Sequence, residues 1–67
     1  MNRSHYHLTI RDDYSKNVVM VGDFDSASRA ATAMMDYFQN SPAPYLEATL
    51  DYPDGRSFST KNYTPVR

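Results

Sequence analysis

Only one stretch of this 67-residue chain repeats its apolar residues at the period of an α-helix, and it lies in the middle, at residues 25–40. The residues that would share one side of this helix are Ala27, Ala30, Ala31, Met34 and Phe38, flanked by Met35 and Tyr37. A single amphipathic helix needs an apolar layer to cover. The rest of the chain must therefore supply a sheet.

Both ends of this helix are marked in the sequence. Asp25 or Ser26 can cap the first turn, because short polar side chains accept hydrogen bonds from exposed backbone N–H groups. At the other end, Asn40 is a candidate C′ residue and the segment 41–44 holds two prolines, which cannot continue a helix. We therefore expect the helix to stop near residue 40.

The remaining chain shows four segments with strand character, at residues 5–11, 18–21, 45–52 and 56–63. Alternation is cleanest in 45–52, where every second residue is apolar or aromatic. Polar residues 12–17 form the first turn, Gly22 closes the second segment, and Pro53-Asp54-Gly55 predicts a bulged hairpin with glycine at the left-handed position.

The order of these elements is ββαββ. The helix returns the chain so that the third segment pairs beside the first, which predicts an antiparallel four-stranded sheet in the order 2-1-3-4 with the helix on one face. We expect one α+β domain over residues 1–67, with a tail at 64–67 that frays.

The composition of the chain excludes several classes of protein. The chain has no cysteine, so neither disulfides nor thiolate metal sites stabilise it, and no apolar run suits a signal peptide or a membrane span. Seven basic and eight acidic residues give a net charge of −1, which does not suit a general nucleic-acid binder. We expect a cytoplasmic protein that does not bind membranes.

One helix can cover only one face of the sheet, so the other face is the main functional candidate. Alternation assigns to it His5, His7, Thr9, Arg11, Met20, Tyr45, Glu47, Thr49, Asp51, Ser57, Ser59 and Lys61, with Tyr63 as a further candidate. Six tyrosines and three phenylalanines exceed what a thin core needs, so some rings should lie at the surface. The residues we expect to contact a partner, on this face and at the hairpin tips, are Tyr45, His7, Arg11, Arg56, Lys61 and Tyr14.

Catalytic and metal sites are not indicated. His5 and His7 share a strand face, but a zinc site needs three or four fixed ligands. The chain has no nucleophile elbow, phosphate-binding glycine loop or metalloprotease motif, so we expect no enzyme activity, no metal and no cofactor. An alternative is that nucleic-acid bases stack on exposed rings of the open face, namely Tyr45, Tyr63, His5 and His7. The acidic Glu47 and Asp51 on the same face argue against this alternative.

Two likenesses to known families are present. Residues 19–26 with the alanine-rich helix resemble half of a SPOR domain, but the SPOR pattern then repeats strand and helix, whereas this chain continues with a hairpin. In size and ββαββ order the whole chain is similar to small inhibitors of host defence encoded by phages and mobile elements, including anti-CRISPR proteins. That resemblance implies a stoichiometric inhibitor in the host cytoplasm that docks on a nucleic-acid-handling complex.

The sequence thus favours a non-catalytic protein-binding module of the inhibitor type. The alternatives are a self-associating homodimeric module, paired through the open face or an edge strand, and a weak single-stranded nucleic-acid binder.

Overall fold

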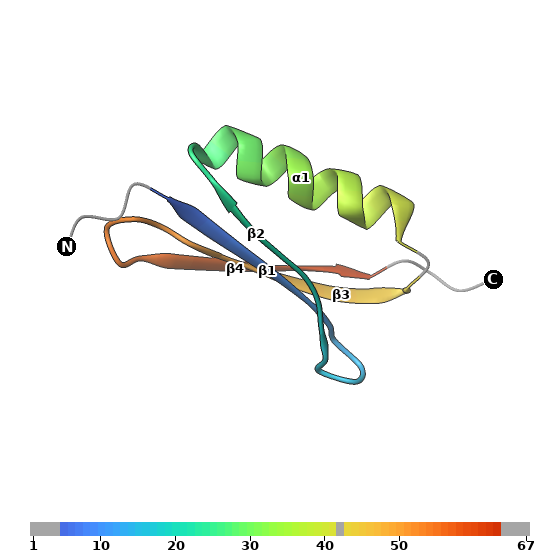
Figure 1. Cartoon of the computed structure of the whole chain (residues 1–67). Coiled ribbons are helices and arrows are strands. Elements are labelled where there is room, and N and C mark those ends of the chain that lie inside the picture. The colour runs from blue at the N-terminus through green and yellow to red at the C-terminus, as the bar shows by residue number, and fades with distance from the viewer. Residues whose placement is uncertain (1–4, 42, 64–67) are drawn as a thin grey trace.

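Four strands and one helix follow one another in the order ββαββ, as predicted (Figure 1). The computed structural model describes residues 5–41 and 43–63, so the predicted tail at 64–67 lies outside the described residues. The elements are β1 (Tyr6–Asp12), β2 (Val18–Phe24), α1 (Ala27–Asn40), β3 (Tyr45–Asp51) and β4 (Ser57–Tyr63).

The strands form one sheet in the order β2-β1-β3-β4, and every neighbouring pair is antiparallel. Each outer pair is a hairpin of strands adjacent in the chain. The central pair β1 and β3 joins the two hairpins, with Leu8 opposite Leu50 and Ile10 opposite Ala48. The predicted α+β architecture and strand order are confirmed.

Helix α1 begins where its cap was expected. The Ser26 hydroxyl accepts a hydrogen bond from the backbone N–H of Arg29 at 3.1 Å, so Ser26 is the N-cap. At the other end Asn40 is still helical, and Ser41 turns extended at φ −81° and ψ 138° while its N–H bonds the Tyr37 carbonyl. The extended Ser41 follows from the proline after it, which disfavours helical geometry in the preceding residue.

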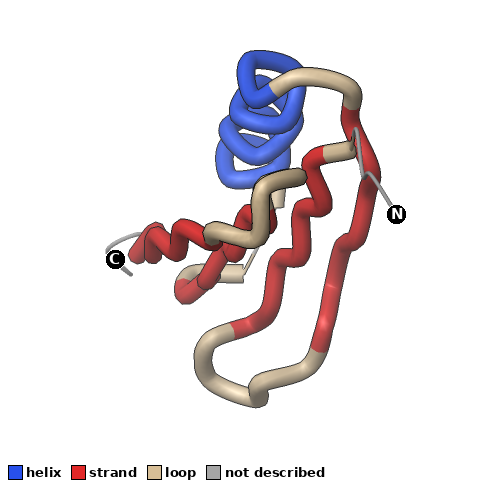
Figure 2. Tube along the Cα trace, turned by 90° about the vertical axis from the view of Figure 1, so that its left-hand side faces the viewer, coloured by secondary structure: helices blue, strands red, loops and turns tan. Residues whose placement is uncertain are grey.

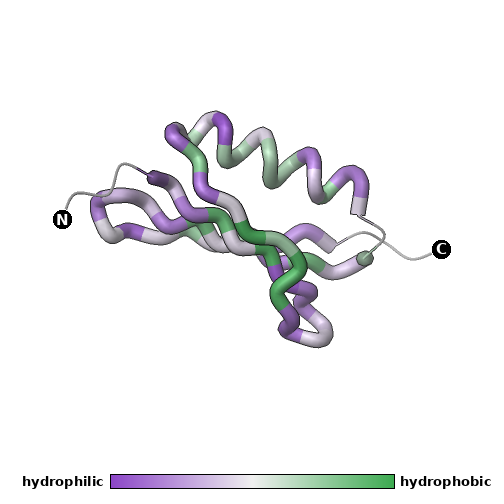
Figure 3. The backbone as a smooth tube through the Cα atoms, viewed as in Figure 1, coloured by the Kyte–Doolittle hydropathy of each residue, from purple (hydrophilic) through white to green (hydrophobic). Residues whose placement is uncertain are grey.

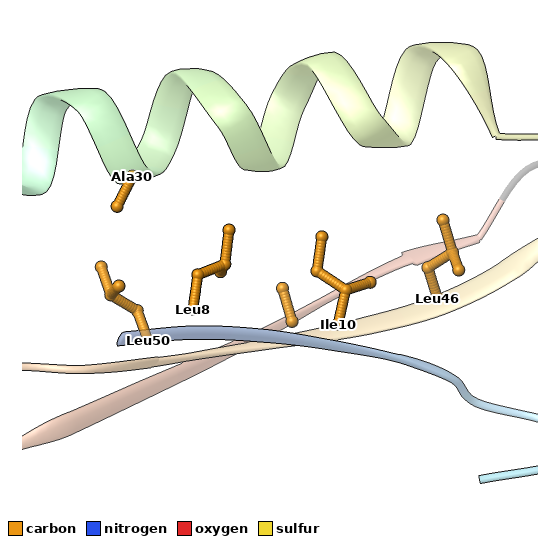
Figure 4. Close-up of a cluster of buried hydrophobic side chains, with 6 residues drawn as sticks. Leu8, Ile10, Ala30, Leu46 and Leu50 are labelled. Atoms are coloured by element: carbon orange, nitrogen blue, oxygen red, sulfur yellow. The ribbon is translucent and has the colours of Figure 1, made fainter. Parts of the chain in front are cut away.

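The core lies between α1 and the two central strands (Figure 4). The buried apolar side chains of the described chain are Leu8, Ile10, Ala30, Leu46, Ala48 and Leu50. Figure 4 shows the leucines and Ile10 rising from the sheet toward the helix, with Ala30 pointing back at them. Ala30 brings the helix close to the sheet because its side chain is a single methyl group.

Strand β2 differs from its prediction in length and in the side to which Met20 points. It continues through Gly22 to Phe24, and Met20 pairs with Ile10 and packs against the core instead of lying on the open face. The register shifts between Ile10 and Arg11, where Arg11 pairs with Val18. The run of Val18 to Val21 lacks polar alternation, so its sequence could not reveal which side faces the helix.

The β1–β2 hairpin extends away from the helix. In Figures 1 and 2 its turn projects beyond the layer formed by α1 and the sheet. Val18, Val19 and Val21 of β2 are all exposed although they lie in a strand. At the opposite side of the sheet, Phe58 of β4 points to the helix side as predicted but remains 55% exposed.

Candidate binding surface

The face of the sheet away from α1 is called the open face below. Alternation and register place on it Thr9, Val21, Asp23, Glu47, Thr49, Asp51, Ser57, Ser59 and Tyr63, together with the predicted contact residues His7, Arg11, Tyr45 and Lys61. These side chains form rows across the four strands. The rows differ in charge from one end of the face to the other.

The first row carries a histidine between two carboxylates. His7 pairs in register with Asp23 on one side and Asp51 on the other, and its Nδ1 lies 2.8 Å from Oδ1 of Asp23. His5 is exposed just before this strand. Among residues 5–41 and 43–63 no group of three histidine or acidic side chains could hold a metal ion. The close contact of His7 with Asp23 is a side-chain hydrogen bond.

The middle row is uncharged. It contains, in order across the sheet, Val21, Thr9, Thr49 and Ser59. The hydroxyl oxygens of Thr49 and Ser59 lie 3.2 Å apart. This row separates the acidic end, at His7, from the opposite end of the face.

That opposite end, called the aromatic end, consists of Arg11, Tyr45, Glu47, Lys61 and Tyr63. Arg11 and Glu47 are register partners, as are Glu47 and Lys61. Tyr45 and Tyr63 pair next to them, with ring centroids 5.3 Å apart and an interplanar angle of 79°. Edge-to-face contact of this kind holds both rings in defined positions. The two rings are 42% and 52% exposed.

Asp13 anchors the aromatic end to the β1–β2 turn. Its carboxylate accepts hydrogen bonds from Tyr63 and from the Lys16 ammonium at 2.8 Å, and Lys61 Nζ lies 3.6 Å away. Its backbone N–H donates to the Tyr45 carbonyl at 3.0 Å. The hydrogen bond from Lys16, followed by that from Tyr63, lowers the pKa of Asp13 to about 2. The carboxylate is therefore ionised at neutral pH.

The same cluster acts on Lys61. Hydrogen bonding with Tyr63, followed by the charge of Asp13, raises the pKa of the Lys61 ammonium above its ordinary value. The Asp13 side chain is only 11% exposed, so turn and strand enclose it. The aromatic end is thus a fixed arrangement built from three separate segments.

The predicted contact residues fall into separate places. Arg11, Tyr45 and Lys61 come together at the aromatic end, and Tyr14, 87% exposed, lies in the adjoining turn. His7 lies at the acidic end. Arg56 is away from this face: its guanidinium is 2.8 Å from Asp54 and 5.2 Å from the ring centre of Tyr52, which packs on the helix side.

A second feature lies on the helix side, between α1 and β4. It is a groove of about 180 Å³, lined by Leu8, Ala27, Ala30, Ala31, Met34, Ala48, Leu50, Tyr52 and Phe58. This groove exists because α1 covers β1, β2 and β3 but leaves β4 uncovered. Tyr52 supplies the one titratable side chain of its lining, so the groove offers an apolar surface and little chemistry.

The prediction missed Asp13 and the exposed valines of β2. Asp13 lies in a polar turn, and nothing in the sequence connects it with Tyr63, fifty residues later. The valines did carry a signal, since an apolar run without alternation presents apolar side chains to both faces of a strand.

In the described part of the chain, no helix has the length and apolar character needed to cross a membrane.

Comparison with known proteins finds no matching family model, no similar curated protein and no similar solved structure.

Proposed function

We propose that this protein is a non-catalytic binding module that docks the aromatic end of its open face on a partner protein. The observation that carries this proposal is the pair of exposed, mutually packed rings of Tyr45 and Tyr63 beside Arg11. Tyrosine and arginine are enriched among the residues that dominate binding energy at protein interfaces.

Rigidity supports this choice of surface. Binding costs free energy when flexible side chains must be ordered, and Tyr63 is already held by Asp13 and by the ring of Tyr45. Arg11 forms no hydrogen bond or ion pair with another described residue, so its guanidinium can pair with a carboxylate of the partner. The partner we propose thus presents an acidic side chain next to an apolar contact for the rings.

The charges of this end argue against nucleic acid as the ligand. The Asp13 carboxylate, whose pKa is lowered to about 2, and the Glu47 carboxylate lie among the same side chains as Arg11 and Lys61. Ionised carboxylates repel the phosphates that supply most of the affinity of nucleic-acid binders. A protein surface with mixed charge suits this arrangement better.

A small domain that binds through one rigid patch acts by covering part of its partner. We infer a stoichiometric inhibitor, and the likeness of the ββαββ order to phage-encoded inhibitors makes a bacterial nucleic-acid-handling complex the first partner to test. The apolar lining of the groove beside α1, with no acid–base pair, supports a role without catalysis.

The test starts with a tagged protein used to capture partners from a nuclease-treated bacterial lysate. A captured partner is then purified and titrated with the protein by calorimetry. We expect a fixed stoichiometry, and we expect Arg11→Ala and Tyr45→Ala each to weaken binding by at least about 30-fold, which corresponds to roughly 2 kcal/mol for an interface hot spot.

Matched controls come from the outer side of α1. Arg29→Ala and Met35→Ala remove an exposed arginine and an exposed apolar side chain that lie away from the open face, and both should leave affinity unchanged. Thermal unfolding confirms that each variant folds. Undiminished binding by a folded Arg11→Ala, Tyr45→Ala double variant would overturn the proposed surface.

A further inference from the structure

We propose that β2 is a self-pairing edge, through which two copies of this chain join their sheets antiparallel about a two-fold axis at Met20. Strand β2 is an outer strand of the sheet, and no other described element lies on its outer side (Figure 2). A strand in this position presents backbone N–H and C=O groups that can pair with another strand.

Side chains on β2 favour such pairing. Val18, Val19 and Val21 are 50%, 41% and 59% exposed, and residues 18–22 contain no charged side chain or proline. Figure 3 shows the first part of β2 as a continuous hydrophobic stretch. Proteins commonly protect sheet edges with lysine or proline. The other edge, β4, has such protection in Lys61, whose side chain is 50% exposed.

Charge complementarity selects a second copy as the occupant and antiparallel as the direction. Lys16 lies two residues before β2, whereas Asp23 is inside its far end and Asp25 follows it. Antiparallel pairing of two identical strands brings Lys16 of one copy toward Asp23 and Asp25 of the other, in addition to its ion pair with Asp13 of its own copy. Parallel pairing would place like charges side by side.

The register follows from the same side chains. An axis at Met20 sets Val19 of one copy opposite Val21 of the other, twice, so four exposed valines meet along the paired edges. An axis at Val21 would instead set Val19 opposite Asp23. An axis at Val19 would pair Val19 with itself but set Val21 opposite Asn17, and the axis at Val21 pairs only Val21 with itself. Only the first register sets both Val19 and Val21 of each copy opposite a valine.

In this arrangement the two sheets form one eight-stranded sheet. The two-fold axis is perpendicular to the sheet, because residues that face each other across an antiparallel pair point to the same side. The two helices therefore share one face, and the two open faces become continuous. One dimer presents two aromatic ends, whatever partner they bind.

The first test is register-specific cross-linking. The chain has no cysteine, so Met20→Cys introduces a single thiol per copy at the proposed axis. Under mild oxidation we expect nearly complete disulfide dimer. Val18→Cys is the matched control on the same strand: it pairs with Gly22 of the other copy, which leaves its two thiols too far apart to bridge. Equal cross-linking of both variants would overturn the register.

The second test is mass in solution without cross-linking. By light scattering and sedimentation we expect the 7.7-kDa chain to approach twice its mass as concentration rises, with a dissociation constant in the micromolar range, since pairing one short strand buries less than a standard interface. Val21→Lys should raise the dissociation constant at least about 100-fold, because it places a charge on the edge.

Ser59→Lys is the control for the second test, since it adds the same charge to the exposed edge strand β4 and should leave the dimer intact. Circular dichroism shows whether both variants fold. A folded wild-type protein that stays monomeric at its highest soluble concentration would overturn the proposal. So would dimers that Ser59→Lys disrupts and Val21→Lys does not.

Discussion

The hydroxyl of Tyr63 donates a hydrogen bond to the carboxylate of Asp13, fifty residues earlier in the chain. The bond ties the last described strand to the turn after the first. With Lys16 and Lys61 at 2.8 Å and 3.6 Å from the same carboxylate, it makes Asp13 the centre of the aromatic end.

Acid should weaken the fold through Asp13. Its pKa is lower in the folded chain, at about 2, than in the unfolded chain, at about 3.9. Its contribution to the free energy of unfolding is therefore complete above about pH 4 and is lost as pH falls toward 2. Urea unfolding at several pH values measures this loss. Asp13→Asn should be less stable at pH 7 and lose less stability in that window; equal acid sensitivity of both proteins would contradict the assignment.

Alkaline pH should lower the stability of the fold through Lys61. Its pKa is raised in the folded chain, so its contribution is complete below the ordinary lysine pKa and is lost as pH rises through the raised value. Lys61→Gln should lower stability at neutral pH and remove this contribution. Unfolding midpoints measured between neutral pH and pH 11 report the difference. Tyr63→Phe is a second test, since it removes the hydroxyl whose hydrogen bond contributes most to raising the pKa of Lys61, and it should reduce the alkaline loss as well.

Lys16 has a left-handed backbone, with φ at 67°, which costs most residues roughly 1–2 kcal/mol. Lys16→Ala removes the ion pair with Asp13 but keeps this strain, whereas Lys16→Gly removes both. Since glycine is also more flexible when unfolded, we expect the glycine variant to be more stable than the alanine variant by about 0.5–1 kcal/mol. Urea titration of the two variants measures this. An alanine variant as stable as the glycine variant would contradict the prediction.

Gly22 lies beneath the ring of Phe24. A Cβ atom at this position would be 3.0 Å from Cε2 and 3.1 Å from Cζ of that ring, so the ring must shift. Gly22→Ala should cost roughly 1 kcal/mol as an overpacked site. In a Phe24→Ala background the same change should cost nothing, because only the glycine flexibility remains. A double-mutant cycle measures this coupling, and a coupling near zero would show that the ring does not constrain the glycine.

Ile10 is fully buried in a thin core. Ile10→Ala should cost about 2–5 kcal/mol and Ile10→Val about 0.5–1.5 kcal/mol, because each leaves a cavity of different size. Chemical unfolding of both gives the comparison, and Met35→Ala on the exposed helix side serves as the control, with an effect within about 0.5 kcal/mol. Similar losses from Ile10→Ala and Met35→Ala would contradict the position of the core.

The sequence predicted those parts of the fold that depend on local periodicity. Alternation in Leu46, Ala48 and Leu50 placed β3 and its buried side, and Ser26 marked the start of α1. The side to which Met20 points was wrong, because the valine-rich run around it has no polar residue to set its phase. Gly22 does not end β2, since pairing with β1 continues from Gly22 opposite Leu8 to Phe24 opposite Tyr6.

The candidate site could be predicted only in part. Arg11, Tyr45 and Lys61 share a face because alternation places each of them there. Their anchor, Asp13, depends on the register of two hairpins and on the turn geometry at Lys16, which local sequence does not determine. Arg56 was predicted as a contact residue because arginine is enriched at interfaces. Its contacts with Asp54 and Tyr52 instead hold it away from the open face.

The strand order also determines when each strand gains its neighbours as the chain folds. The β1–β2 hairpin is complete as soon as Phe24 has been synthesised, but β1 gains its second neighbour only when β3 follows the helix. Until β3 pairs with β1 and α1 packs above them, Leu8 and Ile10 lack the layer that buries them, so the β1–β2 hairpin depends on its own turn and cross-strand pairs.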